Sequence, residues 1–452
     1  MINPVSIVLF CLFVFVLAWS VYNLPILAAG VRRIRKRKSL VGDSCLGNKQ
    51  LPTFSIIVPA KNEGKVIGRF LDAVAKLDYP KDKVEVIVVE DGSTDDTIGI
   101  CTRHVEMQNA NVRVVHKSAC NGKPSALNYG LEKAKGEIVA FFDADSVPAS
   151  DALLNVGRYF EDPNVAAVQG RTLSINLNQN MLTRFISYEE TVWCEVYLQG
   201  KDALDLFVHL KGSCQFLRRS VLEHLKGFDE NALSEDMELS ARLAERGYKI
   251  RYASDARSWQ ESPADLKQLL RQRTRWFRGT MEVALRYGRL MARPNRLTID
   301  AEVTLAGPFI LILSLLSYVA SFLTFLAPYY FGVVWNCLLQ MSVLTATLTL
   351  FLCGLALIWA SKPRKATSVL WLPFVYFYWT FESLVASYAV WLILLRRPQK
   401  WMKTEKSGQV ANWFWGHRMP VSDSATREGE QMDLMHAREH LRYMGESESQ
   451  TC

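Results

Sequence analysis

Two long stretches without a charged residue limit most strongly what this chain can fold into. Residues 1–30 contain no Asp, Glu, Lys or Arg, and the stretch from Leu305 to Ala360 contains none either. Because about 20 apolar residues are enough to cross the hydrocarbon core of a bilayer, both stretches predict membrane helices. A soluble globular protein is therefore excluded.

The remaining residues have the composition of a folded protein. Of the 452 residues, 49% are hydrophobic and 22% are charged, which excludes a disordered polar chain. At about 100–200 residues per domain, this length allows two or three folding units.

The net charge of +8 is modest, but basic residues are concentrated beside the apolar stretches. Eight arginines lie between Arg271 and Arg296, directly before the second stretch. The cluster after the first stretch consists of Arg32, Arg33, Arg35, Lys36, Arg37 and Lys38. Bases in these places are typical of a cytoplasmic flank that faces anionic lipid. A DNA-binding patch is the weaker interpretation because no nucleic-acid module accompanies them, so we expect no nucleic-acid partner.

The first apolar stretch is followed, and not preceded, by basic residues. This order favours an uncleaved anchor with its N-terminus outside over a secretory signal. We therefore assign residues 1–30 to a transmembrane anchor and residues 31–51 to a basic linker. The nine cysteines form no CxxC pair and no zinc-binding or disulfide-framework spacing, which predicts that the catalytic part faces a reducing compartment.

Strand and helix signals alternate in residues 52–262. The predicted strands are Phe54–Pro59, Val84–Val89 and Ile138–Phe142, and the helices between them are Glu63–Leu77, Thr94–Gln108 and Ser125–Lys135. A helix at Ser234–Arg246 and a strand near Lys249–Ala253 follow. The alternation predicts an α/β domain with a parallel sheet of the nucleotide-binding type.

Acidic residues lie where the predicted strands end. Glu63 follows the first strand, Glu90 and Asp91 the second, and Asp143 and Asp145 the third. In an open α/β sheet the carboxyl ends of the strands line the ligand crevice. These carboxylates are therefore expected to converge.

The C-terminal half predicts a membrane-associated region. Residues 263–302 have the pattern of basic amphipathic helices that lie along the membrane. The region 303–395 contains three segments long enough to span a bilayer, namely 303–330, 334–360 and 367–395. Basic clusters flank the third segment at both ends, and a single crossing would put them on opposite sides of the membrane. Either that segment is re-entrant or interfacial, or an earlier segment does not fully cross.

We predict that segment 367–395 does not make a simple crossing, because Pro373 and Glu382 offer a place where the helix could break inside the protein. The polar tail, residues 396–452, is then expected to be cytosolic from Trp401 to Cys452. Its last part, from Asp423 onward, has the composition of a mobile segment.

The motif Asp143-Ala-Asp145 directly follows a buried apolar run and is therefore placed at a strand end. Two carboxylates there would suit Mg²⁺ or Mn²⁺, because these ions take oxygen ligands and share them with substrate phosphates. For the pair alone, an exposed acidic turn is an equally good interpretation.

The loops after the first two strands carry further polar groups. Residues Pro59–Glu63 and Glu90–Asp95 supply carboxylates and turns that could hold a base and a ribose. Ser93 or Thr94 could instead merely cap the next helix. Lys123 offers a cation near the same crevice, although a solvated lysine is the commoner role for such a residue alone.

Two motifs follow at the beginning of predicted helices. Glu235 and Asp236 open one helix, where the helix dipole favours a carboxylate and where a simple cap is also possible. Gln272, Arg275 and Trp276 are spaced at i, i+3 and i+4 and therefore share one helix face. A guanidinium suits a phosphate and an indole suits stacking on a sugar, whereas an Arg/Trp belt at a membrane interface is the alternative.

Taken in order, these motifs resemble the D, DxD, ED and QxxRW signature of family 2 glycosyltransferases. The residues that carry the resemblance are Asp91, Asp143-Ala-Asp145, Glu235-Asp236 and Gln272-Arg-Thr-Arg275-Trp276. The branch they resemble contains the membrane synthases of cellulose, chitin, hyaluronan and poly-N-acetylglucosamine. The resemblance covers Pro52 to Arg296 and the flanking membrane segments.

The resemblance implies a GT-A fold, with a mixed, mainly parallel sheet and flanking helices, that binds a nucleoside-diphosphate sugar, usually UDP-linked. It implies donor binding by Pro59, Glu63, Asp91, Lys123, Asp143, Asp145 and Arg275. Asp143 and Asp145 would also hold Mg²⁺ or Mn²⁺. Asp236 would be the catalytic base, and Glu235, Gln272 and Trp276 would bind the acceptor.

The implied activity is that of a metal-dependent, inverting hexosyltransferase that extends a β-linked polysaccharide. The alternative is transfer of a single sugar to a membrane lipid or lipid phosphate. The indole of QxxRW favours the polysaccharide, whereas the modest number of candidate spans favours the lipid. A non-catalytic nucleotide-binding scaffold in the membrane is a remote third hypothesis. Because nucleotide sugars are made in the cytosol, we expect an integral protein of the plasma membrane, in contact with membrane lipids, whose catalytic domain is cytosolic.

Overall fold

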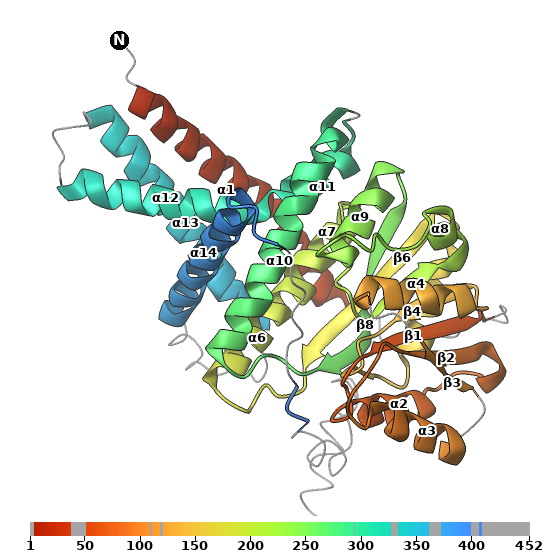
Figure 1. Ribbon diagram of the computed structural model, residues 1–452. Coiled ribbons are helices and arrows are strands. Elements are labelled where there is room, and N and C mark those ends of the chain that lie inside the picture. The colour runs from red at the N-terminus through yellow and green to blue at the C-terminus, as the bar shows by residue number, and fades with distance from the viewer. Residues whose placement is uncertain are drawn as a thin grey trace, which may run out of the picture.

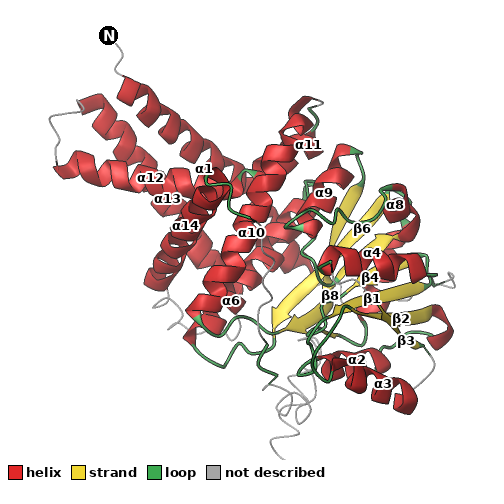
Figure 2. Ribbon diagram, in the orientation of Figure 1, coloured by secondary structure: helices red, strands yellow, loops and turns green. Residues whose placement is uncertain are grey.

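The computed structural model describes residues 4–37, 51–108, 111–117, 121–292, 294–326, 333–360, 372–398 and 406–408. One side of the molecule is an α/β unit, and the other side is a group of long helices (Figure 1). Figure 2 shows that all the strands belong to the α/β unit. Helix α10 (Leu266–Tyr287) lies between the two parts.

The α/β unit contains one sheet of eight strands, in the order β3-β2-β1-β4-β7-β6-β8-β5. The strands are β1 (Phe54–Ala60), β2 (Val84–Glu90), β3 (Val112–His116), β4 (Ile138–Phe141), β5 (Val147–Pro148), β6 (Val165–Ser174), β7 (Gln215–Arg218) and β8 (Lys249–Gln260). Strands β3, β2, β1 and β4 are parallel to one another, and β6 is parallel to β8. Strand β7 is antiparallel to β4 and β6, and β5 is antiparallel to β8. The prediction of a mixed sheet with flanking helices is confirmed.

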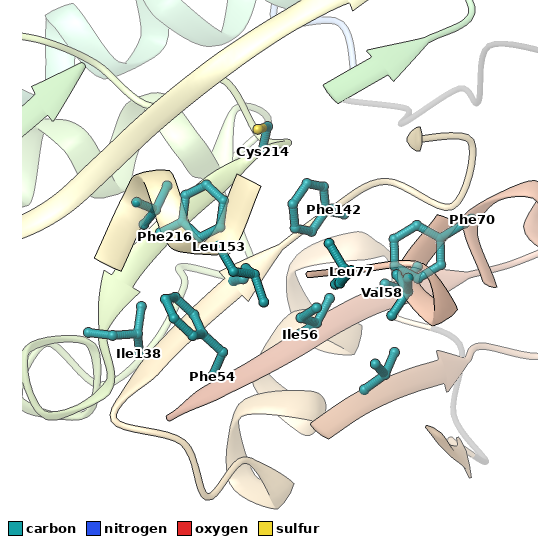
Figure 3. Packing of buried hydrophobic residues seen from close by; sticks show 14 of the residues in the cluster. Phe54, Ile56, Val58, Phe70, Leu77, Ile138, Phe142, Leu153, Cys214 and Phe216 are labelled. Carbon is teal, nitrogen blue, oxygen red and sulfur yellow. The ribbon is translucent and has the colours of Figure 1, made fainter. Parts of the chain in front are cut away.

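Alternation of side chains along β1 divides its apolar residues between two cores. Phe54, Ile56 and Val58 belong to one core, and Ile57 belongs to the other. Figure 3 shows the first core, in which these residues pack near Phe142. Because successive side chains of a strand point to opposite faces, a strand covered on both faces is a continuous apolar run. This is why the FSIIVP sequence predicts the strand correctly.

Short helices cover both faces of the sheet. They are α2 (Ile67–Ala75), α3 (Thr97–Gln108), α4 (Lys123–Lys133), α5 (Ala152–Gly157), α6 (Met181–Val192), α7 (Gln199–Ala203), α8 (Arg219–His224) and α9 (Glu235–Glu245). A π-helical turn, Trp193–Leu198, joins α6 to α7. Helices α2 and α3 contribute to the first core, and α4, α8 and α9 contribute to the second.

The predicted strands and helices of the α/β unit are present, with several shifts in extent. Helix α3 begins at Thr97 instead of Thr94. Helix α2 begins at Ile67 instead of Glu63, because the carbonyl of Glu63 accepts the N–H groups of Val66 and Ile67 in a turn that precedes the helix. Strand β8 extends to Gln260 instead of ending near Ala253. Its extension continues the pairing with β6, which no local signal in the sequence indicates.

The long helices are α1 (Pro4–Arg37), α11 (Arg296–Leu305), α12 (Gly307–Leu326), α13 (Val333–Ala360) and α14 (Leu372–Leu394). By length and composition, Phe10–Ile34 in α1 and Tyr376–Leu394 in α14 could each cross a membrane. Helices α11 and α12 are bent by 54° and would make a third candidate span if counted together.

The basic linker predicted at residues 31–51 is wrong in its first part, because α1 continues to Arg37. Lysine and arginine have high helix propensity, so a basic cluster after an apolar run does not end a helix. Residues 38–50 of this prediction lie outside the described part of the chain.

Helix α14 is continuous, so the expected break at Pro373 and Glu382 is wrong. Pro373 lies in the first turn of the helix, where its missing N–H costs no hydrogen bond. Tyr378 near the start of α14 and Arg397 just past its end both contact α10, so α14 packs along that helix.

A buried ion pair joins α1 to the α/β unit. The Lys201 ammonium lies 2.8 Å from Asp300 Oδ2 of α11, and the Tyr22 hydroxyl of α1 donates to Asp300 Oδ1 at 2.6 Å. Helix α1 approaches α7 closely, since a Cβ on Gly200 would lie 2.0 Å from the carbonyl oxygen of Ile26. Small residues allow such contacts between helix backbones, and here they fix α1 against α7.

Candidate functional site

Lys123 links two of the predicted carboxylate motifs. Its ammonium lies 2.8 Å from Asp143 Oδ1 at the end of β4 and 3.2 Å from Glu235 Oε1 at the start of α9. Burial would lower the pKa of Lys123, but Asp143 and Glu235 raise it above its usual range. The lysine therefore remains charged and holds the ends of β4 and α9 together.

The loop before β7 closes on this cluster. Lys123 also donates to the carbonyl of Gly212 at 3.1 Å, and Asp143 N–H donates to Ser213 Oγ at 3.1 Å. Gly212 has a positive φ of 76°, and a Cβ there would lie 3.1 Å from Asp236 Oδ2. Both the left-handed conformation and the close approach require glycine. The Gly212–Ser213 turn therefore packs directly against the residues of the site.

Asp236 has the environment of a carboxylate that can exchange a proton near neutral pH. Burial raises its pKa to about 6, and the adjacent Glu235 carboxylate contributes to the increase. The Ser234 hydroxyl donates to Asp236 Oδ1 at 2.7 Å and Met237 N–H donates at 2.8 Å, and both bonds oppose the increase. The other oxygen, Oδ2, faces the Gly212 turn.

Asp145 is buried and lies on the far side of the motif from Lys123. It accepts the Glu261 N–H at 3.1 Å and forms an ion pair with Lys406 at 2.7 Å. Although burial works against ionisation, Lys406 lowers the pKa of Asp145 below its usual value. Each carboxylate of the DxD motif thus has its own lysine.

The segment after α14 reaches Asp145 and Glu261 with Lys406, Ser407 and Gly408. Lys406 donates to the Glu261 carbonyl at 2.9 Å, and Ser407 N–H donates to Glu261 Oε2 at 2.7 Å. The other oxygen of Glu261 forms a buried ion pair with Arg69 at 2.9 Å. Residues 406–408 therefore contact the α/β unit.

The loops after β1 and β2 are bonded to each other. Thr94 N–H donates to Asn62 Oδ1 at 2.7 Å, and Glu63 N–H donates to Thr97 Oγ1 at 2.8 Å. Asp91 follows β2, is 3% exposed, and has the Lys117 ammonium 3.7 Å away. Pro59 lies within β1.

Glu90 is buried behind this loop and accepts hydrogen bonds from the Ser93 N–H and from His116. Burial opposes the charge of Glu90, but the bond from Ser93 keeps its pKa below the usual range. Ser93 is therefore part of the loop's internal bonding. The alternative prediction was that the Ser93 side chain caps the next helix. Among the described residues, Ser93 makes no such capping hydrogen bond.

Gln272, Arg275 and Trp276 are all partly buried on α10. Between them lies Arg273, whose guanidinium is 4.7 Å from the centre of the Trp276 ring. Helix α10 reaches the start of α9 at Gly279, where a Cβ would lie 2.6 Å from the Cβ of Ser234, the residue before α9. The QxxRW helix thus touches the start of the helix that carries the predicted base.

The DxD carboxylates fit a divalent cation as a partial ligand set. Both of them have a lysine ammonium at ion-pair distance, which marks the place as one that attracts cations. Within the described residues, no group of three or more His, Cys, Asp or Glu side chains could hold a metal by itself. Magnesium and manganese sites with one or two carboxylates are commonly completed by substrate phosphates. The residues therefore fit a metal that binds together with a diphosphate.

Three residues of the site could not be found from the sequence. Lys406 lies 145 residues after Glu261, in a segment predicted only as a polar tail. Glu261 directly follows β8, and the sequence predicted that this strand ends earlier, near Ala253. Arg273 lies inside the QxxRW motif, and the only signal for it was its position one residue after Gln272.

Comparison with known proteins shows the family. The sequence model of a family described as "Glycosyltransferase like family 2" matches residues 52–279. The probable glycosyltransferase YdaM of Bacillus subtilis is 37% identical over 243 residues, which are 53% of this chain and 58% of that protein. The beta-monoglucosyldiacylglycerol synthase of Nostoc sp. is 34% identical over 251 residues, which are 55% of this chain and 53% of that protein. The chain thus spans little more than half the length of these curated relatives.

A similar solved structure is that of the mannosyltransferase PcManGT from Pyrobaculum calidifontis, in complex with GDP-Man and Mn²⁺. The TM-score is 0.54 at 22% sequence identity, and the match covers 86% of this chain and all of the other. This likeness shows a shared fold.

Proposed function

The chain belongs to the glycosyltransferase-like family 2, and we propose that it transfers a sugar from a nucleoside-diphosphate donor to a hydroxyl group of an acceptor held at the membrane. One observation carries the proposal. Asp143 and Asp236, from the ends of two separate elements, converge on Lys123 and the Gly212 turn. Carboxylates from the DxD and ED motifs therefore lie around the same ammonium group and the same turn.

In this proposal Asp236 is the general base. Its carboxylate accepts the proton of the acceptor hydroxyl, whose oxygen then forms a bond to the anomeric carbon while the bond to the diphosphate breaks. Attack from the face opposite the diphosphate inverts the anomeric carbon, so an α-linked donor gives a β-linked product. A pKa of about 6 keeps most of Asp236 ionised at neutral pH.

The donor is proposed to lie along the carboxyl ends of β1, β2 and β4. Glu63 and Asp91 would hold the base and ribose, with Pro59 beside them, and Asp143 and Asp145 would hold the diphosphate through Mg²⁺ or Mn²⁺. When bound, the metal would neutralise the negative charge that develops on the leaving diphosphate. The complex of PcManGT with GDP-Man and Mn²⁺ supports a divalent ion and leaves both UDP and GDP sugars as candidates.

Lys123 and Lys406 would meet the same diphosphate. Each ammonium is bound to a DxD carboxylate, so donor and metal can bind only if these ion pairs rearrange. Arg275 is proposed as a further diphosphate ligand, with Gln272, Glu235 and Trp276 on the acceptor side.

We propose a membrane lipid as the first candidate acceptor. The beta-monoglucosyldiacylglycerol synthase of Nostoc sp. supports it, since that relative is named for a lipid product. A growing β-linked polysaccharide is the second candidate, and the Trp276 ring on α10 favours it because an indole can support a sugar chain. In both cases the catalytic unit would lie in the cytosol, where nucleotide sugars are made, and the protein would be integral to the plasma membrane.

The test uses membranes that contain the full chain. They are incubated with radiolabelled UDP-glucose, UDP-N-acetylglucosamine or GDP-mannose and with Mg²⁺ or Mn²⁺, and lipid-soluble product is separated from high-molecular-weight product. Asp236→Asn is the control: it should bind donor normally and lose a factor of about 10²–10⁴ in rate. Binding of nucleotide without turnover of any donor by the unchanged chain would contradict the proposal and favour the scaffold hypothesis.

A further inference from the structure

Two opposite charges lie over one face of β6 without forming an ion pair with each other. The Lys211 ammonium donates to Thr172 Oγ1 at 3.0 Å, and the Glu190 carboxylate accepts a bond from Ser174 Oγ at 3.5 Å. Thr172 and Ser174 are two residues apart on β6, so their side chains point to the same face of the strand. The strand therefore holds Lys211 and Glu190 side by side, and we call them the Glu190–Lys211 pair.

Neither charged group has a strong partner in the described part of the chain. The second contact of the Lys211 ammonium is the Cys194 sulfur at 3.7 Å, which is a weak acceptor, and Glu190 has only the long bond from Ser174. Both charged side chains are half-buried, whereas the hydroxyl-bearing residues beneath them, Thr172 and Ser174, are only 2% and 3% exposed. The pair is therefore accessible from the side away from β6 and can accept further hydrogen-bond partners there.

The spacing and the charges of the pair select the kind of ligand. At about 3.3 Å per residue, the Cα atoms of Thr172 and Ser174 are roughly 7 Å apart, and the two charged groups are held above them. One positive and one negative charge together favour neither an anion nor a cation. A sugar ring fits this gap, because one of its hydroxyls can accept from Lys211 while another donates to Glu190.

Lys211 connects the pair to the reaction centre. It directly precedes Gly212, where a Cβ would lie 3.1 Å from Asp236 Oδ2 and 3.4 Å from the Lys123 ammonium. The turn that packs against the proposed base therefore also carries one member of the pair. A ligand that displaces Lys211 would disturb this turn, and a ligand that binds Lys211 is held close to it.

Glu190 connects the pair to the QxxRW helix. Its neighbour on α6, Glu189, forms an ion pair with Arg273 of α10. Burial raises the pKa of the Glu190 carboxyl above its usual range, and the positive charges of Lys211 and Arg273 work in the opposite direction. Glu190 therefore lies within electrostatic reach of both the QxxRW motif and the loop before β7.

Helix α6, which carries Glu190, lies between the sheet and the long helices (Figure 1). It packs against β6 and against α13, and the ring of Phe185 stacks on Tyr378 of α14 with a centroid distance of 6.2 Å. The pair is thus located where an acceptor held by the long helices would meet the α/β unit.

We propose that Glu190 and Lys211 bind a neutral sugar ring of the acceptor, Lys211 by donating to one hydroxyl and Glu190 by accepting from another. The proposal rests on the proposed function, because it adds a subsite for the acceptor of the same transfer. It assigns the pair no part in donor binding or in proton transfer. The ring can belong to a glycolipid headgroup or to a polysaccharide, since both offer the same hydroxyls.

The test measures transfer by the full chain in detergent micelles. The acceptors are diacylglycerol, which has no sugar, monoglucosyldiacylglycerol, which has one sugar on a lipid, and a soluble β-linked glucose tetramer. Glu190→Gln and Lys211→Met should each raise the half-saturating concentration of a sugar-bearing acceptor about tenfold, because each variant loses a hydrogen bond with a charged partner. The half-saturating concentration of diacylglycerol, the affinity for UDP and kcat at saturating acceptor should not change. The sugar-bearing acceptor that the unchanged chain uses distinguishes a glycolipid from a polysaccharide.

Thr191→Ala is the matched control, since Thr191 follows Glu190 on α6, is half-buried, and donates its hydroxyl to the Ser187 carbonyl of its own helix. It should leave every acceptor unaffected. Lys211→Arg retains a positive donor and should keep part of the affinity. Because Glu190 and Lys211 lie on separate elements, either variant still tests the proposal if the other fails to fold.

Three outcomes overturn the proposal. An unchanged half-saturating concentration of the sugar-bearing acceptors in both variants would remove the pair from the acceptor site. Equal loss with diacylglycerol, together with a lower melting temperature, would make the pair a structural feature of α6 and β6. Transfer by the unchanged chain to diacylglycerol but to neither sugar-bearing acceptor would leave no acceptor sugar for the pair to bind. In each case the unchanged chain still transfers sugar, so failure of the proposed function, seen as no transfer and no donor hydrolysis, is distinct.

Discussion

The pKa of Asp236 can be shifted in opposite directions by changing the two residues that precede it. The Ser234 hydroxyl donates to Asp236 Oδ1 at 2.7 Å and stabilises the charged form. The Glu235 carboxylate raises the pKa of Asp236, after burial as the first cause. We predict that Ser234→Ala raises the pKa of Asp236 and that Glu235→Gln lowers it.

The magnitudes follow from these interactions. A hydrogen bond to a charged group is worth about 1.5–3 kcal/mol, and one pKa unit corresponds to about 1.36 kcal/mol. Water can replace part of the lost bond, so Ser234→Ala should raise the pKa by roughly one unit, from about 6 to roughly 7. Ser234 makes no side-chain cap bond to α9, so this change leaves the helix start intact. Loss of the Glu235 charge, partly offset by Lys123, should lower the pKa by on the order of one unit.

The assay is the pH dependence of kcat/KM for the donor, at fixed metal and saturating acceptor. Asp236 acts as a base only when it has lost its proton, so the rate should be on a plateau above about pH 6 and fall about tenfold per pH unit below it. The acidic limb should move to higher pH in Ser234→Ala and to lower pH in Glu235→Gln. UDP affinity, measured over the same pH range, separates this effect from loss of donor binding.

The reasoning would be refuted if both variants shifted the acidic limb in the same direction. It would also be refuted if their activities fell while the limb stayed at the position of the unchanged chain. Either result would mean that the limb reports another group and that Asp236 is not the base.

Three further predictions concern the DxD motif and the tail. Asp145→Ala should abolish metal-dependent transfer and weaken UDP binding, and retained turnover in this variant would remove Asp145 from the metal site. Lys406→Met should tighten the binding of Mn²⁺ in the absence of donor, because it removes the ammonium 2.7 Å from Asp145 Oδ2; a titration that shows unchanged or weaker binding argues against competition for this carboxylate. The tail from Trp401 to Cys452, which apart from residues 406–408 lies outside the described part of the chain, should be cytosolic. Labelling of Cys452 in intact cells by a membrane-impermeant thiol reagent, in a variant without the other cysteines, would contradict this.

Much of the candidate site was predictable because its motifs are local. A continuous apolar run such as FSIIVP predicts a strand covered on both faces, and the residue after it then lies at the ligand edge of the sheet. This reasoning placed Asp91, Asp143 and Asp145 at strand ends, where the structure has them. The helix that begins at Glu235 was predicted in the same way.

The errors arose where a side chain or a chain segment is positioned by residues distant in the sequence. Basic residues after the first apolar stretch suggested a linker, but α1 continues through them and is fixed by contacts with α7 and α11. Pro373 suggested a break, but it occupies the first turn of α14, which packs along α10. Position within a helix, and not the residue type alone, decides what a proline does.

The sequence by itself determined the family signature, the α/β alternation and the apolar helices, because each depends on residues close together in the chain. Only the tertiary structure decided which charges meet. It brought Lys123 between Asp143 and Glu235, placed Lys406 on Asp145, and buried Glu382 beside Arg273. The free energy of an ion pair depends on distance and burial in the folded molecule, and neither quantity is contained in the order of the residues.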